Sequence, residues 1–427
     1  MDKVDVLKAI NDRYFAARIG GRLRFFEDRF PLEGMDAQAM RYTLATHKVQ
    51  VETKDGFKTE PAYKHWEEWH GRRFYPDGFI LDPNAASHGE RAYNLWRGYG
   101  VEPIEGDIDR LLQHLEVIET DAREYIWKWI CWVIQNPAAK PKVAVVLRGA
   151  EGVGKGFIGQ CLMRIFGEHA MQLTQRRHVT GNFNAHLRHI CLLFADEADF
   201  TATDGEGVLK TLITEETMAV EAKGVDVKQE ASHIAMFMST NRDWAVPAGL
   251  GARRFVVADV GDDHKGNSKY WEALFGWLDD GGASALLKAA LAEDLTGWHP
   301  EKNRVATGAL RDQQANSLRG IDRLLFRLLW EGEACDIIPS RWLIEQAERL
   351  GEDKDVSMTL WHRLIGKGKV PKTTWQKEDR ARPVGWRPPQ SLRQAREELF
   401  PGTDWPDDRE EWTMVSAEEL KVRDCPF

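Results

Sequence analysis

The segment Pro141–Ile158, PKVAVVLRGAEGVGKGFI, sets the architecture that we expect for this chain. It begins with the apolar run Val143–Leu147, which is rich in β-branched residues and predicts a buried strand. The glycine-rich loop Gly149–Gly156 follows and leads into a helical pattern that runs through Phe166. Glycines let backbone N–H groups turn towards phosphate oxygens, and a helix N-terminus adds partial positive charge. The segment therefore predicts an α/β fold with a phosphate-binding loop.

The loop matches the pattern GxxxxGK-Ser/Thr at every position but the last. Gly149, Gly154 and Lys155 fit, whereas Gly156 stands where a hydroxyl residue should ligate Mg²⁺. Lys155 would place its ammonium on the β- and γ-phosphates of ATP, and Mg²⁺ would be held by water, the phosphates and a downstream acid. The alternative is a glycine-rich turn without a ligand. The expected nucleotide contacts are Gly149, Glu151, Gly152, Val153, Gly154, Lys155, Gly156 and Phe157.

Two later apolar runs end in polar residues that suit the same chemistry. Ile190–Ala195 is followed by Asp196 and Glu197, about forty residues after the loop. Asp196 would hold Mg²⁺ directly or through water, and Glu197 would polarise the water that attacks the γ-phosphate. The run from Ile234 ends in Ser-Thr-Asn, which would place Asn241 beside the γ-phosphate.

Basic residues near these runs are candidates for charge stabilisation and DNA contact. Arg253 and Arg254 precede a further apolar run, and an arginine supplied across a subunit boundary can stabilise a transition state. A surface ion pair is the alternative. Met218–Lys228 alternates around a central glycine and predicts a β-hairpin with Lys223 at its turn. Lys223 and Lys228 are candidate DNA ligands, although a lysine at a turn is equally often only solvated.

The composition limits the remaining possibilities. A chain of 427 residues predicts two or three domains, and a net charge of −9 argues against a uniformly basic DNA-binding protein. The five cysteines are widely spaced without a CxxC pair, which favours buried, reduced thiols in a cytoplasmic protein. No signal peptide and no run of eighteen apolar residues is visible, so we expect no membrane partner.

Residues 1–105 predict an aromatic-rich α+β region. We expect a helix over Asp5–Arg18 and short strands over Leu23–Phe26 and His47–Glu52. Aromatic and arginine side chains between Trp66 and Tyr99 could stack nucleic-acid bases, but a small aromatic core is the favoured interpretation. Residues 106–140 predict a helical collar and linker. Residues 141–300 predict the ATPase core, with a helix over residues 270–291 behind it as a small lid.

Residues 301–396 predict a winged-helix-like domain. Helical patterns over residues 321–329, 342–350 and 358–366 precede a strand-like segment at residues 384–387. Ten Lys and Arg residues stand against two acids between residues 361 and 396, which favours DNA contact. Residues 397–427 form an acidic tail with ten acids and three bases, and its pairing with the basic block is the alternative. The candidate DNA ligands are Arg363, Lys367, Lys369, Lys372, Arg380, Arg382 and Arg387.

The order of these motifs resembles that of superfamily 3 helicases, in particular the helicase part of phage and plasmid primase–helicase proteins. The likeness covers roughly Tyr93–Val257, including the lead-in at residues 93–98 and the Phe-Asn element at residues 183–184. It implies an AAA+-type core, a homo-hexameric ring with ATP between subunits, and movement on single-stranded or forked DNA. The location would be the bacterial host cytoplasm if the chain is phage-encoded. The implied roles are Walker A lysine for Lys155, Walker B acids for Asp196 and Glu197, sensor for Asn241, hairpin lysine for Lys223, and finger for Arg253 or Arg254.

This chain departs from that family in two ways. Gly156 replaces the hydroxyl residue, and no primase domain is expected before the helicase part, so the partner would be a separate primase or polymerase. The function predicted from the sequence is an ATP-dependent replicative DNA helicase. The alternative is an ATP-switched replication initiator or loader that unwinds weakly or not at all, and Gly156 keeps this alternative open.

Overall fold

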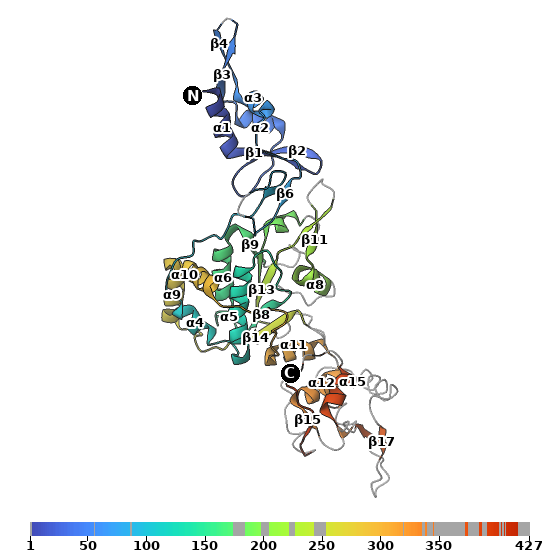
Figure 1. Cartoon of the computed structure of the whole chain (residues 1–427). Helices are drawn as coiled ribbons and strands as arrows, with labels where there is room; N and C mark the ends of the chain where they lie inside the picture. The colour runs from blue at the N-terminus through green and yellow to red at the C-terminus, as the bar shows by residue number, and fades with distance from the viewer. Residues whose placement is uncertain are drawn as a thin grey trace.

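The computed structural model describes residues 2–54, 56–85, 88–173, 184–197, 205–221, 227–242, 253–318, 320–334, 391–400 and 407–416, with short pieces at 338–339, 345, 372–374, 384–386, 403 and 405. Figure 1 shows three parts in chain order: an N-terminal part, a central part built around a parallel sheet, and a C-terminal part. None of the helices among these residues combines the length and the apolar character needed to cross a bilayer.

The N-terminal part mixes short helices with small sheets. Its elements are α1 (Lys3–Arg13), β1 (Tyr14–Ile19), β2 (Arg22–Glu27), α2 (Ala37–Thr43), β3 (Lys48–Thr53), β4 (Gly56–Pro61), α3 (Ala62–Glu68), β5 (Phe74–Tyr75), β6 (Phe79–Ile80) and β7 (Tyr93–Asn94). β1 pairs with β2 antiparallel and with β5 parallel. The two expected strands are confirmed as β2 and β3, but the helix expected over Asp5–Arg18 is wrong beyond Arg13. Residues 14–17 are buried on both faces of β1, so their pattern lacks the alternation that marks a strand.

Aromatic side chains form the core of the N-terminal part. Phe15 stacks on Tyr93 with ring centroids 4.1 Å apart and on Phe26 at 5.3 Å. Trp66 and Tyr93 are fully buried, which confirms the core interpretation for these residues. Phe79 is different, because its side chain is only partly buried at the edge of this core.

Asp28 links the N-terminal part to the segment that enters the central part. Its carboxylate accepts hydrogen bonds from Arg73 Nη1 at 2.7 Å, from the Tyr93 hydroxyl at 2.6 Å and from Arg97. Burial alone would raise the pKa of Asp28, but the hydrogen bonds from Tyr93, Arg97 and Arg73 outweigh it and lower the pKa to about 2.

The central part is organised around a five-stranded parallel sheet in the order β14-β8-β13-β10-β9. Its strands are β8 (Ala144–Arg148), β9 (Ala170–Leu173), β10 (Leu192–Asp196), β13 (Ala235–Thr240) and β14 (Phe255–Asp259). β8 lies between β14 and β13 and is therefore an internal strand. The loop that follows it lies at the carboxyl ends of the strands, with a neighbouring strand on each side.

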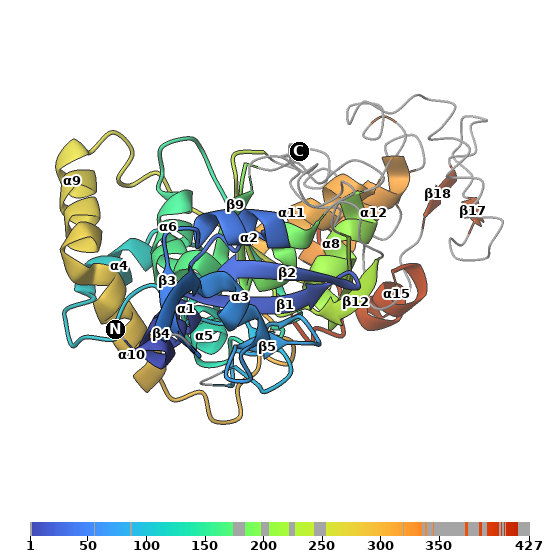
Figure 2. The same ribbon diagram turned by 90° about the horizontal axis from the view of Figure 1, so that it is seen from above.

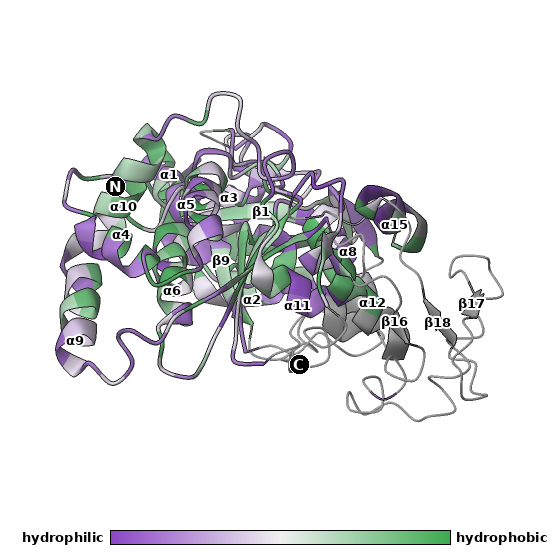
Figure 3. Ribbon diagram, turned by 90° about the horizontal axis from the view of Figure 1, so that it is seen from below, coloured by the Kyte–Doolittle hydropathy of each residue, from purple (hydrophilic) through white to green (hydrophobic). Residues whose placement is uncertain are grey.

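Helices cover both faces of this sheet. One face carries α5 (Thr120–Gln135), α6 (Lys155–Phe166) and α10 (Ala283–Ala292), and the other carries α8 (Gly205–Thr214), the hairpin β11 (Thr217–Val220)–β12 (Lys228–Ala231) and α11 (Gly308–Ser317). Within β8, Val145 and Leu147 face the first layer while Ala144 and Val146 face the second. In Figure 3 the hydrophobic colour gathers on the central strands and α10, whereas α11 is mostly hydrophilic. The strands of the core and the antiparallel hairpin are thus confirmed.

The remaining central elements lie beside the sheet. They are α4 (Asp109–Leu115), the short turns η1 (Gly167–His169) and η2 (Ala185–His189), α9 (Ser268–Trp277) and the π turn η3 (Leu278–Gly282). The two helices expected over residues 106–136 are confirmed as α4 and α5. The helix expected over residues 270–291 is broken between α9 and α10, where Gly281 has φ +88°. Three cysteines, Cys131, Cys161 and Cys191, are buried free thiols.

The C-terminal part contains α12 (Gly320–Glu331), β15 (Glu333–Ala334), β16 (Ile338–Pro339), β17 (Lys372–Thr374), β18 (Val384–Trp386), α15 (Leu392–Leu399) and β19 (Thr413–Met414). β18 pairs antiparallel with both β16 and β17, and β15 pairs with β19. The strand expected at residues 384–387 corresponds to β18. The helices expected over residues 342–350 and 358–366 lie outside the described residues, apart from the single residue 345, so the winged helix stays a prediction.

The end of the basic block pairs with the acidic segment that follows it. Arg396 is 3% exposed and donates to Asp407 at 2.9 Å, and Arg393 donates to Glu410 at 3.2 Å. For these two arginines the intramolecular pairing weighed above is confirmed, and the buried Arg396 is not free to form a DNA-binding face.

The link through Asp28 predicts a pH-dependent contribution to stability. At pH 7 we expect Asp28→Asn to lower the free energy of unfolding by about 2 kcal/mol, because the folded-state pKa lies below the unfolded value. A lowered carboxyl pKa stabilises the fold above the unfolded pKa, so the contribution should vanish as pH falls from about 4 to about 2. Urea unfolding as a function of pH measures it.

Asp77→Asn is the matched control. Asp77 forms an exposed pair with Arg91, so its loss should leave the unfolding transition nearly unchanged. Equal pH profiles for Asp28→Asn and the parent protein would show that the buried link does not stabilise the fold.

Candidate nucleotide-binding site

The glycine loop leads directly from β8 into α6. Gly152 and Gly154 have φ of +80° and +92°, which β-carbon-bearing residues rarely adopt. Gly154 also lacks room for a side chain, because a Cβ there would lie 2.4 Å from the Trp271 ring and 2.5 Å from the His114 ring. Helix α6 begins at the next residue, Lys155, so its unpaired N–H groups face the loop.

The loop opens into a cavity of about 360 Å³ at the carboxyl edge of the sheet. Its walls come from the loop and the start of α6, from the end of β10 and from the end of β13, and α9 closes one side. The volume lies within the usual range for small-ligand sites. Lys155, Asp196 and Glu197 thus line one cavity, together with Ser239 and Trp271. Of the expected nucleotide contacts, Glu151, Gly152, Gly154, Lys155, Gly156 and Phe157 line it, whereas Gly149 and the buried Val153 do not.

Lys155 is an almost buried cation held in the loop. Its side chain is buried, and Nζ donates to the carbonyl oxygen of Ala150 at 2.5 Å. Burial lowers the pKa of Lys155, while the charges of Glu197 and Asp196 act in the opposite direction. An ammonium and two carboxylates that share a cavity can bind a phosphate group and a divalent cation together.

Asp196 is the described carboxylate best suited to hold Mg²⁺. Its Oδ1 accepts a hydrogen bond from Ser239 Oγ, and its Oδ2 accepts one from Gln172 Nε2 at 3.1 Å. A Cβ at Gly156 would lie 3.8 Å from the same Oδ1. Mg²⁺ prefers carboxylate, hydroxyl and water oxygens, so the residues present fit this cation. The hydroxyl at the site comes from Ser239 rather than from position 156.

Glu197 has an uncommon backbone conformation. Its φ is +56°, and its N–H donates to the carbonyl oxygen of Ser239 at 2.8 Å. Left-handed conformations of non-glycine residues cost free energy and persist where the surrounding structure enforces them, often at functional sites. The bond to β13 therefore fixes the direction of the chain at the point where Glu197 enters the cavity.

Other predicted site residues lie away from the cavity. Asn241 follows β13 and is exposed, outside the residues that line the cavity. Arg253 and Arg254 precede β14, whose first residue pairs with Ala144 at the start of β8. They lie at the amino edge of the sheet. The length of β8, taken from the usual rise per strand residue, separates them from the loop by about 16 Å. The Nε of Arg254 is buried without a hydrogen-bond partner among the described residues.

The predicted DNA ligands are placed only in part. Lys228 is the first residue of β12 and is exposed. Lys372 begins β17, of which the backbone alone is described. The others lie outside the described residues: Lys223, Arg363, Lys367, Lys369, Arg380, Arg382 and Arg387.

Sequence reasoning missed the residues that hold the loop from the side. His114 Nε2 lies 3.2 Å from the carbonyl oxygen of Gly154, and its Nδ1 lies 2.9 Å from the Tyr270 hydroxyl. Burial lowers the pKa of His114 to about 4. The neutral ring must carry its proton on Nε2, because a carbonyl only accepts, and Nδ1 then accepts from Tyr270.

Helix α9 forms part of the site. Its Trp271 and Phe275 line the cavity, so the helix lies beside the loop and not behind the core as expected. Phe275 also contacts Phe157 edge to face, with ring centroids 5.4 Å apart. The apolar spacing of α9 indicated a helix, and no local signal related it to the loop more than a hundred residues earlier.

Comparisons with known proteins address the fold. A family model described as a family of unknown function (DUF5906) matches residues 147–254. No curated protein matches the sequence significantly. The apo structure of the NrS-1 C-terminal region (305–718) is similar, with a TM-score of 0.61 and 14% identity over 90% of this chain and 99% of that chain. The A form of the same region has a TM-score of 0.62 at 14% identity, over 91% and 100% of the two chains. This chain therefore shares the fold of that region along nearly its whole length.

The arrangement around Asp196 predicts that Ser239 and position 156 can exchange roles. We expect Ser239→Ala to weaken Mn²⁺ binding in the presence of ADP by about 10-fold, because Asp196 loses its hydroxyl partner. Gly156→Ser in the same chain should recover most of this loss, since the contacts at that position leave room for a Cβ. Electron paramagnetic resonance of bound Mn²⁺ measures the affinity.

Ser232→Ala, which removes a buried hydroxyl just before β13, is the matched control and should not change Mn²⁺ affinity. Unchanged affinity in Ser239→Ala would count against a role of this hydroxyl in cation binding.

Proposed function

We propose that this protein is an ATP-dependent replicative DNA helicase of the superfamily 3 type. The observation that carries the proposal is the single cavity that Lys155, Asp196 and Glu197 line at the carboxyl edge of a parallel sheet. A phosphate loop, a cation-holding acid and a second acid are the parts that nucleoside triphosphate hydrolysis requires. The fold shared with the NrS-1 C-terminal region supports a common architecture for all three parts of the chain.

In this proposal each residue has one role. The loop N–H groups and Lys155 bind the phosphates of ATP, and His114 and Trp271 keep the loop in place. Bound Mg²⁺ would supply charge neutralisation on the phosphates, with Asp196 and Ser239 as its protein side. Glu197 accepts the proton of the attacking water, a role that its position in the cavity supports.

The position of Arg253 and Arg254 favours a ring. Both precede β14 at the edge of the sheet opposite the loop, so neither reaches the nucleotide of its own subunit without a large movement. A neighbouring subunit could present its nucleotide to them. We therefore propose a homo-hexamer in which one of these arginines completes the nucleotide site of the adjacent subunit. The substrate would be single-stranded or forked DNA, and a separate primase or polymerase would be the partner.

The C-terminal part is proposed as a DNA-binding winged-helix-like domain. The antiparallel sheet β16-β18-β17 supports a wing, and the basic block from Arg363 to Arg382 supports phosphate contact. Arg396 is excluded from that role because it is buried in its ion pair with Asp407.

The second candidate function is an ATP-switched replication initiator or loader. The glycine at position 156 favours it, because the loop lacks the hydroxyl that usually ligates Mg²⁺, and the slow hydrolysis expected without it suits a switch. Strand displacement from a forked duplex, driven by ATP, separates the two functions, since the initiator would bind duplex DNA without unwinding it.

Removal of the loop lysine tests the ATP site. We expect Lys155→Ala to abolish ATP turnover while the fold is kept, because the ammonium is lost from the phosphates. The assay is phosphate release with and without single-stranded DNA, alongside circular dichroism. Lys269→Ala, on α9 outside the cavity, serves as the control. Full hydrolysis by Lys155→Ala would remove the assignment.

Mixed subunits test whether the arginines act across the interface. Arg253→Ala or Arg254→Ala should reduce turnover by about 1,000-fold or more if that residue is the finger. Mixing this variant with Glu197→Gln should restore part of the activity, because some interfaces then hold an intact acid and an intact arginine. Glu197→Gln mixed with Lys155→Ala should stay inactive, since both residues belong to the same half-site. No complementation by either arginine variant would contradict a shared site.

A further inference from the structure

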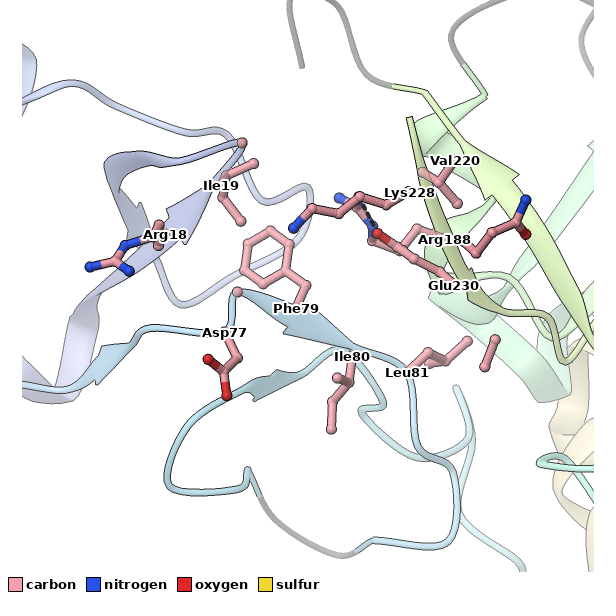
Figure 4. A pocket seen from close by; sticks show the side chains of 14 residues that line it. Arg18, Ile19, Asp77, Phe79, Ile80, Leu81, Arg188, Val220, Lys228 and Glu230 are labelled. Atoms are coloured by element: carbon pink, nitrogen blue, oxygen red, sulfur yellow. Dashed lines mark hydrogen bonds and ion pairs between the residues drawn. The ribbon is translucent and has the colours of Figure 1, made fainter. Parts of the chain in front are cut away.

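A second cavity, of about 350 Å³, lies between the N-terminal part and the hairpin β11–β12. Figure 1 places β6 next to the hairpin strand β11, and Figure 2, seen from above, places β1 over β12. Figure 4 shows Lys228 reaching from β12 towards the ring of Phe79, with Arg18 beyond Ile19 on the outer side. The cavity therefore combines an aromatic ring from one part of the chain with a cation from the other.

Two cations at this cavity, Lys228 and Arg18, have no carboxylate partner among the described residues. Glu230 is held by Arg188 through two bonds of 2.6 and 2.7 Å, and Asp77 is held by Arg91 through bonds of 2.7 and 2.9 Å. Within the described part of the chain, Lys228 and Arg18 form no ion pair at 4.0 Å or less. The acids are thus neutralised while two positive charges remain available to an anionic ligand.

The ring of Phe79 is held rigidly from behind. It contacts Phe26 edge to face at 5.0 Å, Tyr93 at 5.8 Å and Phe15 at 6.4 Å between ring centroids. Three rings of the N-terminal core therefore fix its orientation while the ring lines the cavity. A fixed aromatic face next to a cation is how proteins bind a base and its phosphate in single-stranded nucleic acid.

We propose that this cavity binds one nucleotide of single-stranded DNA, with the base stacked on Phe79 and the flanking phosphates on Lys228 and Arg18. The inference rests on the proposed function, whose DNA substrate it places between the N-terminal part and the ATPase. The volume lies at the lower end of the range for small ligands, which suits one nucleotide and excludes a duplex.

The backbone connects this cavity to the nucleotide site. Strand β12 carries Lys228 and is followed after a short link by β13, whose residue Ser239, next to its last, lines the proposed ATP cavity. The end of β11 nearest the hairpin connection is held by Asn184, whose Nδ2 donates to the carbonyl oxygen of Ala219 at 2.8 Å and whose Oδ1 accepts from the N–H of Glu221 at 2.9 Å. A strand bound against β12 would therefore contact an element directly continuous with the ATP site.

The test measures binding of a labelled oligothymidine of about 12 nucleotides to the full chain by fluorescence anisotropy. Phe79→Leu keeps an apolar side chain but removes the ring, so we expect the dissociation constant to rise by about 10-fold. Lys228→Ala should weaken binding and reduce the salt slope by about one. Phe57→Leu and Lys48→Ala, at exposed positions on the hairpin β3–β4, are the matched controls and should bind as the parent protein does.

A second readout locates the base directly. Oligothymidine carrying 5-iododeoxyuridine should crosslink on irradiation to the peptide that contains Phe79, and mass spectrometry identifies that peptide. Binding of a fluorescent ATP analogue should be unchanged in Phe79→Leu, which separates this site from the ATP site.

Equal affinity of Phe79→Leu and the parent protein would overturn the inference and leave the helicase proposal standing. If the parent protein binds no oligothymidine yet hydrolyses ATP, both the cavity assignment and the DNA substrate fall, but the ATP site remains. Displacement of the oligothymidine by an equal concentration of thymidine monophosphate would assign the cavity to a free nucleotide and overturn the strand assignment.

Discussion

The parallel register of three neighbouring strands is the constraint on which the site depends. Asp196 of β10 lies opposite Ser239 of β13, and Ser239 lies opposite Leu147 of β8. Because parallel strands end at one edge, the loop after β8 meets the polar ends of β10 and β13 there. A slip of one residue in β10 would turn Asp196 to the other face of the sheet. Burial of Leu193 and Phe194 on opposite faces holds the register against such a slip.

The end of β8 is also held by charge. Arg148, its last residue, bonds Asp259 of β14 through two nitrogens at 2.6 and 2.7 Å and bonds Asp312 of α11 at 2.8 Å. The loop thus begins at a residue bound to the helix that leads into the C-terminal part, and it ends at a glycine that His114 contacts from α4. A short chain of contacts therefore joins the phosphate loop to α4 on one side and to α11 on the other, an arrangement that would suit the proposed ATPase.

Local signals explain how much of this could be predicted. The strand, the glycine loop and the start of α6 are contiguous, so the continuous apolar run and the glycine spacing were sufficient to find them, and the acids after β10 followed a similar apolar run. The contact of His114 and Trp271 with Gly154 joins three distant segments, and a buried histidine on an apolar helix face leaves no spacing signal. The wrong end of α1 has a similar cause, because a strand buried on both faces does not alternate.

The glycine at position 156 is not required by packing. One turn later, a Cβ at Gly159 would lie 2.5 Å from the Phe194 ring, so the close approach of α6 to β10 needs a glycine there. A Cβ at Gly156 would lie 3.7 Å from the same ring, which is an ordinary van der Waals contact. Position 156 could therefore carry a hydroxyl side chain, and the site works without one only if another group serves Asp196. Ser239 already donates to the oxygen that such a hydroxyl would face, so the departure from the loop pattern and the serine at the end of β13 have one physical explanation.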